Sequence, residues 1–218
     1  MDGAAPPVEN ADAKPGFVLI CKSMKELVEH YFRTTAAVPA AEWDFLAPRL
    51  RTQTLAKQEL WLPAGQVSRQ LAFVETGVLR SFLSTDEREI TNDFFLAGSV
   101  AGAFTSFLTQ GPSAWAVQAL APCQLATISH ELLQTLYNRH SCWLHWGRHL
   151  VEAQFLHKCR RETAFLRASA AERYQTLRQQ YPTLEQQVAQ YHIASYLGIK
   201  PETLSRLRAA TGAVSLLS

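Results

Sequence analysis

The sequence of 218 residues lacks the features that mark several common classes of protein. Its four cysteines are scattered, without the Cys-x-x-Cys spacing of a zinc site or the dense pairing of a small disulfide framework. The most apolar stretch, residues 94–108, is interrupted by glycines and hydroxyl residues and falls short of the roughly 20 apolar residues that span a membrane. These absences exclude a disulfide-rich secreted domain, predict no transmembrane helix, and favour the reducing cytoplasm.

Signatures of enzyme active sites are missing as well. Ser, Cys and His are present, but no Gly-x-Ser-x-Gly elbow or paired carboxylate motif frames them. Cys142, His145 and His149 form the densest metal-like group, at positions that share one face of a helix. Such residues are more often packing and surface positions of an interface helix. We therefore predict no enzyme, no metal site and no cofactor.

Acidic residues are scarce in the last third of the chain. Residues 148–218 contain 10 Lys and Arg against 5 Asp and Glu, a net charge of +5, whereas residues 1–147 contain 11 against 14, a net charge of −3. Neutralisation of phosphate by Lys and Arg drives association with nucleic acid. The C-terminal segment is thus a candidate for contact with a polyanion, although an excess of this size also arises by chance.

The apolar pattern predicts strands in the first half of the chain. Helical spacing is expected first, over residues 24–34 and 40–50. From about residue 54 the period changes to that of strands, with Gly and Pro at the turns, which is typical of an antiparallel roll or jelly roll. The expected strands are residues 59–62, 70–75, 78–84, 89–95, 114–120 and 124–128.

After residue 129 the pattern is helical. One helix is expected over residues 130–138 and a much longer one over 141–167, about 40 Å at 1.5 Å per residue. The apolar residues of the long helix, among them Leu144, Val151 and Phe155, lie on more than one side. A helix that is apolar on two sides must bury both, which predicts packing on the roll and on a second copy of the chain in a symmetric dimer.

The last 50 residues predict a compact helical module. Helices are expected over residues 170–181, 184–190 and 192–197, and a final helix begins at Pro201 and ends soon after Arg208.

A helix-turn-helix is the arrangement that fits the end of this module. Gly198 suits a left-handed turn, and Ile193, Leu197 and Leu204 supply a joint core. As a bare pattern, two helices around a Gly turn also occur in αα-hairpins. Polar residues of the second helix suit base edges and phosphates. They are Lys200, Glu202, Thr203, Ser205, Arg206 and Arg208.

Two segments make a family resemblance specific. Pro-Glu-Thr-Leu-Ser-Arg at residues 201–206 resembles the recognition helix of the Crp/Fnr transcription regulators. Leu-Pro-Ala-Gly at 62–65, followed by Phe-Val-Glu-Thr-Gly-Val-Leu-Arg at 73–80, is similar to the opening of their β-roll. The resemblance covers about residues 24–210. It implies that Glu202 and Arg206 reach base edges, while Pro201 departs from a usual arginine, for which Lys200 is the nearest substitute.

The resemblance implies an α+β fold with an antiparallel β-roll or jelly-roll sensor domain, a long dimerisation helix and a C-terminal winged-helix-like helix-turn-helix domain. The expected division is a disordered tail (1–22), a cyclic-nucleotide-binding-like sensor domain (23–140), the dimerisation helix (141–168) and a DNA-binding domain (169–218). Such a bacterial regulator works as a homodimer in the cytoplasm. Its other partners are double-stranded DNA, RNA polymerase and a small-molecule effector that the sequence does not identify.

The sensor half lacks the residues that hold cyclic nucleotides in this family. Those members carry a Gly-Glu pair and an Arg about ten residues later, whereas residues 94–130 contain no Asp, Glu, Lys or Arg. A phosphate without a cationic partner loses a charge-assisted contact, so cAMP is not the expected effector. A pocket in this segment would be lined by Gly98, Gly102, Ala103, Phe104, Ser113 and Ala114.

Three alternatives remain for the roll. Backbone amides near Gly98 could hold an anion, helped by Arg80 or Arg88 from other strands. The roll could instead accept an uncharged or aromatic effector, or be sealed without any ligand. A rival for the whole chain is a ligand-binding protein whose C-terminal module no longer binds DNA, a reading favoured by the short last helix without extra basic residues.

Overall fold

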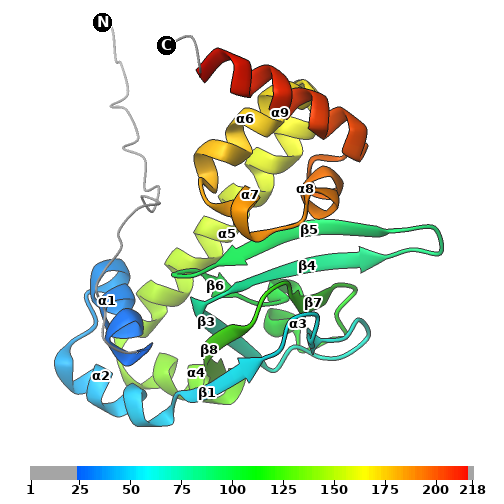
Figure 1. The fold of residues 1–218 in the computed structure, drawn as a ribbon. Helices are drawn as coiled ribbons and strands as arrows, with labels where there is room; N and C mark the ends of the chain where they lie inside the picture. The colour runs from blue at the N-terminus through cyan, green and yellow to red at the C-terminus, as the bar shows by residue number, and fades with distance from the viewer. Residues whose placement is uncertain (1–23, 216–218) are drawn as a thin grey trace, which may run out of the picture.

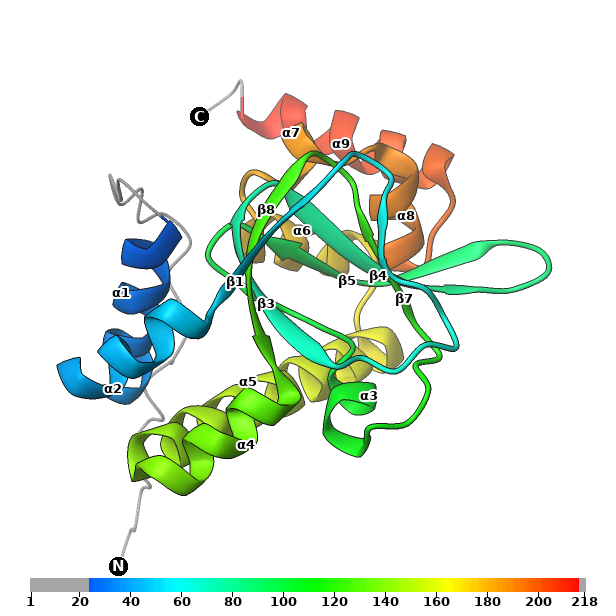
Figure 2. The same ribbon diagram turned by 90° about the horizontal axis from the view of Figure 1, so that it is seen from below.

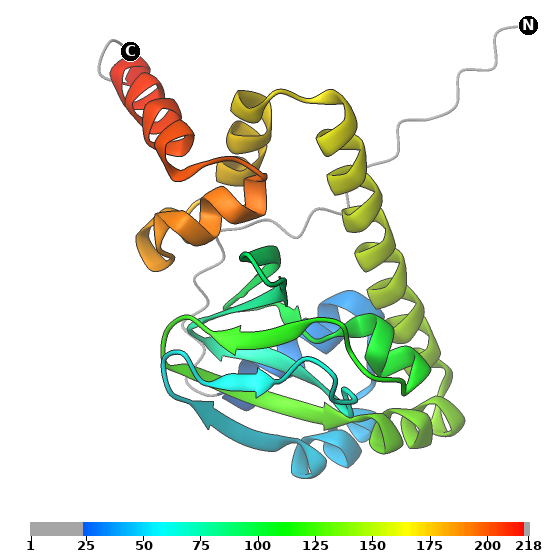
Figure 3. The ribbon, with the colours of Figure 1, turned by 90° about the vertical axis from the view of Figure 1, so that its right-hand side faces the viewer.

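The computed structural model describes residues 24–215, with side chains described as far as residue 210 (Figure 1). The tail predicted for residues 1–22 lies outside the described residues. The chain forms a β-roll, a long helix that runs along its side, and a helical module packed on the roll (Figures 1 and 3). This is the α+β fold that the sequence predicts.

The roll consists of two four-stranded antiparallel sheets, with strand orders β1-β8-β3-β6 and β2-β7-β4-β5. Its core is apolar, and Leu79, Val117 and Leu125 are completely buried there. The strands are β1 (Arg51–Leu55), β2 (Leu60–Leu62), β3 (Gln70–Thr76), β4 (Val78–Ser84), β5 (Glu89–Leu96), β6 (Val100–Ala101), β7 (Ala116–Ala119) and β8 (Cys123–Ser129).

Six of these strands are the predicted ones, with bounds that agree to within two residues. The structure adds β1, β6 and the short helix α3 (Phe104–Thr109), which the sequence pattern does not predict. The helix expected over residues 40–50 is also corrected. It ends at Leu46 as α2 (Ala40–Leu46), and a 3-10 turn, Ala47–Arg49, follows because Pro48 cannot donate the next helical hydrogen bond.

An aromatic cluster joins the leading helices to the roll. Phe32 of α1 (Met24–Ala36) lies 5.1 Å from Phe73 of β3 and 5.1 Å from Trp146, ring centroid to ring centroid. Trp143 contacts Phe32 edge to face and donates from its indole nitrogen to buried Glu42 at 2.9 Å. These contacts hold α1 and α2 at the end of the roll where α4 (His130–Arg139) and α5 (Ser141–Arg167) begin (Figure 2).

Helix α5 spans the predicted 27 residues. The buried residues are all in its first ten positions and include Trp146 and Leu150, whereas the second half carries large exposed side chains. Gly147 lets α4 approach, because a Cβ at that position would lie 2.3 Å from the hydroxyl oxygen of Tyr137. The exposed large hydrophobic residues of α5 are Leu144, Val151, Phe155, Leu156, Phe165 and Leu166.

The C-terminal helices pack on the outer face of the second sheet. They are α6 (Ala170–Gln180), α7 (Leu184–Gln187), α8 (Gln190–Leu197) and α9 (Pro201–Ser215). The side chains of Val78 on β4 and Phe94 on β5 belong to the apolar core of these helices. Strands β4 and β5 are therefore buried on both faces. Helix α8 lies between the roll and α9 (Figure 3). The predicted end of the last helix soon after Arg208 is wrong, because α9 continues to Ser215.

Candidate nucleic-acid interface

Helices α8 and α9 form the helix-turn-helix that the sequence predicts. Gly198 ends α8 with φ of +67°, and the amide of Ile199 donates to the carbonyl of Ala194 at 3.0 Å. A Cβ at Gly198 would lie 2.7 Å from the Phe165 ring of α5, so glycine is required by both conformation and space. Ile193, Leu197 and Leu204 are buried between the helices.

A basic side chain ties this turn to the preceding helices. Arg173 of α6 donates from Nε to the carbonyl of Leu197 at 3.2 Å and from its terminal nitrogen to the carbonyl of Ala168 at 2.7 Å. The arginine therefore serves the fold of the turn and caps the C-terminal end of α8, where cations are favoured.

The predicted DNA-contacting residues, which lie on α9 and directly before it, fall into two groups. Lys200, Glu202, Ser205 and Arg206 are exposed, while Thr203 and Arg208 are partly buried. Glu202 and Arg206 are four residues apart and share the exposed face. The free surface of α9 is thus the face to which the family resemblance assigns base contacts.

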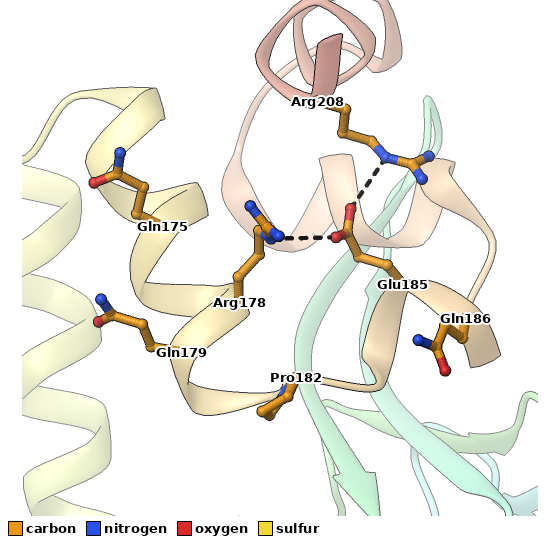
Figure 4. Close-up of a pocket in the computed structure, with 7 residues that line it drawn as sticks. All are labelled: Gln175, Arg178, Gln179, Pro182, Glu185, Gln186 and Arg208. Carbon is orange, nitrogen blue, oxygen red and sulfur yellow. Dashed lines mark ion pairs between the residues drawn. The ribbon is translucent and has the colours of Figure 1, made fainter. Parts of the chain in front are cut away.

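Arg208 points back into its own domain (Figure 4). Its Nε lies 3.1 Å from an oxygen of Glu185 on α7, whose other oxygen lies 3.5 Å from Nε of Arg178 on α6. Tyr174 donates to Glu185 at 2.8 Å, and burial together with this bond raises the pKa of Tyr174 to about 12. The ion pairs border an open cleft of about 580 Å³ lined by Gln175, Arg178, Gln179, Pro182, Glu185, Gln186 and Arg208.

The first helix of the pair is held on the roll by polar contacts. Nδ1 of His192 accepts a hydrogen bond of 2.8 Å from the guanidinium of Arg80 on β4. Oγ of Ser195 accepts from the amide of Thr91 at 2.9 Å and donates to the carbonyl of Glu89 at 3.1 Å. Sequence analysis missed these roles, because contacts over more than 100 residues leave no local pattern.

The long helix completes this junction. Arg161 of α5 donates to the carbonyls of Asn92 at 3.2 Å and Tyr196 at 3.1 Å, and its guanidinium lies 4.3 Å from the Tyr196 ring centroid. Arg161 is therefore engaged by the chain itself, although its charge counts toward the basic C-terminal segment.

Asp93 of β5 is a second polar centre of the junction. This buried carboxylate lies 3.2 Å from Nε2 of His157 and 3.3 Å from Nζ of Lys158, both on α5. Burial by itself raises the pKa of Asp93, but the hydrogen bond and charge of His157 and the ammonium of Lys158 outweigh burial and hold the pKa below its usual value. The carboxylate stays charged and binds β5 to α5.

The residues predicted to line a ligand pocket have different surroundings in the structure. Gly102 faces Leu71, whose side chain would lie 2.5 Å from an added Cβ. Ser113 is buried, and its hydroxyl donates to the carbonyl of Trp115 at 2.7 Å and accepts from the Trp115 amide. Ala103 is buried, Phe104 partly buried, and Ala114 exposed, while Gly98 takes a positive φ in the turn before β6.

The suggestion that Arg80 or Arg88 reaches into this pocket is wrong. Arg80 leaves the roll on its outer side and contacts α8, and Arg88 is exposed in the hairpin between β4 and β5. The alternation of β4 explains the direction of Arg80, because its neighbour Leu79 occupies the inner face.

The candidate metal ligands do not converge. Cys142 is buried, with its thiol pKa raised by burial, while His145 is exposed on the same helix. Within residues 24–215 no three His, Cys, Asp or Glu side chains are arranged to hold a metal ion. None of the helices in that range is long and apolar enough to cross a membrane.

The roll is similar to a known family of domains. Residues 52–140 match the family profile of the cyclic nucleotide-binding domain. No curated protein matches the chain significantly.

Solved structures resemble the chain over most of its length. CLP, a c-di-GMP responsive global regulator from Xanthomonas campestris, has a TM-score of 0.62 and 17% identity over 82% of this chain and 94% of that chain. A structure from Eubacterium rectale described as a transcriptional regulator of the crp/fnr family has a TM-score of 0.62 and 17% identity, over 84% and 88%. The catabolite activator protein of Thermus thermophilus has a TM-score of 0.53 and 20% identity, over 85% and 88%. At these identities the likeness is one of fold.

Proposed function

We propose that this chain, which carries a cyclic nucleotide-binding domain and has the fold of the Crp/Fnr regulators, is a sequence-specific DNA-binding transcription regulator. The observation that carries the proposal is the helix-turn-helix of α8 and α9, with Glu202, Ser205 and Arg206 exposed on one face. A bacterial regulator of this kind acts on DNA in the cytoplasm, with RNA polymerase as a further partner, and needs neither an enzymatic activity nor a cofactor.

Arg206 is the residue that reads sequence in this proposal. A guanidinium can bond bidentately to O6 and N7 of guanine in the major groove, and Glu202 lies beside it on the same face. In this proposal Lys200, Thr203 and Ser205 meet phosphates and base edges around this pair. Arg208 is the most restrained member of the set, because contact with DNA competes with its ion pair to Glu185.

A homodimer through α5 is part of the same proposal. Val151 and Phe155 are 46% and 66% exposed on the second half of α5, and Leu144 lies on the same face at 52%. An apolar stripe of this kind on a long helix suits a second copy of itself. Two copies would present two recognition helices to successive major grooves, about 34 Å apart.

The effector of the roll is proposed to be something other than cAMP. Residues 94–130 offer no charged side chain for a phosphate, and the Ser113 hydroxyl is occupied by Trp115. Millimolar cAMP or cGMP is expected to leave the melting temperature unchanged, whereas a true ligand at 100 times its dissociation constant adds about 2.7 kcal/mol. Calorimetric binding of cAMP in the micromolar range would remove this part of the proposal.

The test of DNA binding is a gel-shift selection from random duplex DNA, followed by two matched arginine variants on the selected operator. Arg206→Ala is expected to cost about 1–3 kcal/mol per half-site and to relax the preference at one base pair. Arg208→Ala is expected to weaken all sequences alike and by less than Arg206→Ala, because the ion pair with Glu185 competes with any phosphate contact. If no duplex is selected, or if Arg206→Ala changes neither affinity nor base preference, the rival of a ligand-binding protein without DNA-binding activity becomes the better account.

A further inference from the structure

The roll and the helix-turn-helix share one apolar core. Phe94 of β5 lies 5.3 Å from Tyr196 of α8, ring centroid to ring centroid, and Val78 of β4 is completely buried in the same cluster. Apolar contact of this kind sets no unique orientation, because it depends on area rather than direction. The orientation of α8 must therefore come from directional contacts at the same interface.

Arg80 is the most directional of these contacts. Its side chain is 3% exposed and donates to Oε1 of Gln118 from Nε at 3.1 Å and from a terminal nitrogen at 2.8 Å. The same terminal nitrogen forms an ion pair with Glu89, and the other contacts His192 on α8. A planar guanidinium with fixed donor directions can bond all three partners only when α8 sits in one position.

The His192 contact also fixes a protonation state. Arginine has donors only, so Nδ1 of His192 must carry a lone pair and the ring must be neutral. The ring is buried at the interface, and the Tyr191 ring lies 3.9 Å from it between ring centroids, tilted by 45°. A neutral, oriented histidine accepts from Arg80 only when the roll and α8 are docked.

Gln118 extends the contact across the outer face of the sheet to the neighbouring strand. It lies on β7, which follows α3 and the loop that holds Ser113, and its amide donates to the carbonyl of Gln58 at 3.0 Å. Any shift of β7 moves the oxygen that holds Arg80. The contacts of Gln118, Arg80 and His192 thus connect β7 to the first helix of the helix-turn-helix.

We propose that Arg80 is a positioning residue that sets the direction of α9 through His192 and reports the position of β7 through Gln118. The docked arrangement is the one that presents α9 to DNA, because Glu202, Ser205 and Arg206 stay exposed while α8 is covered. The claim that Arg80 presents α9 to DNA rests on the proposed function. The claim that Arg80 holds α8 against the roll, the docking part of the inference, does not.

The docking part is tested by amide hydrogen exchange of the full chain without DNA. Arg80→Met keeps the length of the side chain and removes the donors, and Arg88→Met is the matched control at an exposed arginine of the same hairpin. We expect Arg80→Met to speed exchange in residues 190–197 and at the Thr91 amide by about tenfold or more, with the sheet of β1, β8, β3 and β6 unchanged. Arg88→Met should match the wild type.

Two results would overturn the proposal. Uniformly faster exchange in both sheets would mean that Arg80 stabilises the whole fold, and unchanged exchange in α8 would mean that Arg80 does not hold this helix. Should Arg80→Met fail to fold, α8 offers the same test from its side. His192→Leu removes the acceptor, whereas His192→Asn restores one near the position of Nδ1. We expect only His192→Leu to speed exchange in α8, and equal behaviour of the two variants would count against the contact.

The positioning role is tested on a selected operator in which the spacing between half-sites is varied by one base pair at a time. The wild type should prefer one spacing, and Arg80→Met should lose about tenfold at that spacing and little elsewhere, because two half-sites bind together only when the geometry fits. If the wild type binds no duplex, the proposed function is wrong, and the hydrogen-exchange experiment alone tests whether Arg80 holds α8 against the roll. A variant with unchanged spacing preference would end the positioning role alone.

Discussion

The two halves of α5 have the same helical geometry but opposite surroundings. The first ten residues place Trp143, Trp146 and Leu150 in the aromatic cluster with α1 and β3. From residue 151 onward no residue of α5 is buried, and Phe155 is 66% exposed. The second half touches the rest of the chain mainly through polar groups, such as Lys158 and Arg161.

This difference shows how one helix can serve two purposes. An apolar anchor is insensitive to salt and pH and costs several kcal/mol to break, so the first half is fixed to the roll. Polar contacts on the second half depend on charge and geometry, and its exposed apolar stripe has room for a second copy. The helix is therefore anchored by buried apolar side chains at one end and by polar contacts farther along.

The largest effect is expected from Trp146→Ala in the first half. The side chain is completely buried against Phe32 and Phe73, so truncation should lower the free energy of unfolding by about 3–5 kcal/mol. Urea denaturation followed by circular dichroism measures this loss. A loss below about 1 kcal/mol would mean that the anchor is not where the structure places it.

Val151→Asp probes the stripe of the second half. A charge buried between two copies of α5 should weaken the dimer by about 3 kcal/mol or more, while the fold of each subunit persists. Sedimentation equilibrium of wild type and variant gives the difference. A wild type that sediments as a monomer at micromolar concentration would disprove the dimer through α5.

Acid should loosen the helix-turn-helix while leaving the aromatic anchor intact. Burial and the charge of Arg80 lower the pKa of His192 to about 4, although Glu89 opposes this. Because the ring is neutral when docked, docking is fully stable above the ordinary pKa of about 6.5 and weakens as pH falls toward 4, by about 2 kcal/mol at pH 5.

Amide exchange in residues 190–197 at pH 7 and pH 5, corrected for the intrinsic rate, measures this effect. Near-ultraviolet circular dichroism of the buried tryptophans should stay constant over the same range. His192→Asn should abolish the pH dependence of α8, and a dependence that survives this substitution would have to come from another group.

The smallest effect is expected from Leu156→Asp, which is the control for Val151→Asp. Leu156 is 51% exposed but lies about 100° around the helix from Phe155, away from the stripe. Both the free energy of unfolding and the dimer dissociation constant should change by less than about 0.5 kcal/mol. A dissociation as large as that of Val151→Asp would show that the stripe has been assigned to the wrong face.

Local patterns account for most of the fold. The strands around Gly77 and the long helix without proline follow from alternation and period, and the helix-turn-helix follows from Gly198 and its apolar neighbours. Strand β1 is not predicted because Arg-Thr-Gln-Thr-Leu at 51–55 is almost wholly polar, as suits an edge strand that pairs only with β8. Helix α3 escapes because six residues show less than two turns of a period.

The candidate site is predictable only in part. The exposed face of α9 can be proposed from spacing and resemblance, but its DNA contacts remain predictions. The contacts of Arg80 with His192 and of Asp93 with Lys158 leave no signal in the sequence, since the partners are 112 and 65 residues apart. Charge counting likewise assigns Arg161 and Arg208 to a polyanion, although each has a partner within the chain that the sequence pattern does not reveal.

The shared core of Val78, Phe94 and the C-terminal helices has a consequence for modularity. A fragment cut after α5 would carry the helix-turn-helix but leave part of its apolar surface in water, together with a histidine whose donor is gone. The unit that can be transplanted into a chimeric regulator therefore includes the β4–β5 hairpin. For the same reason, a substitution among the outward-facing residues of this hairpin limits which residues fit in α8, so the two segments would have to change together.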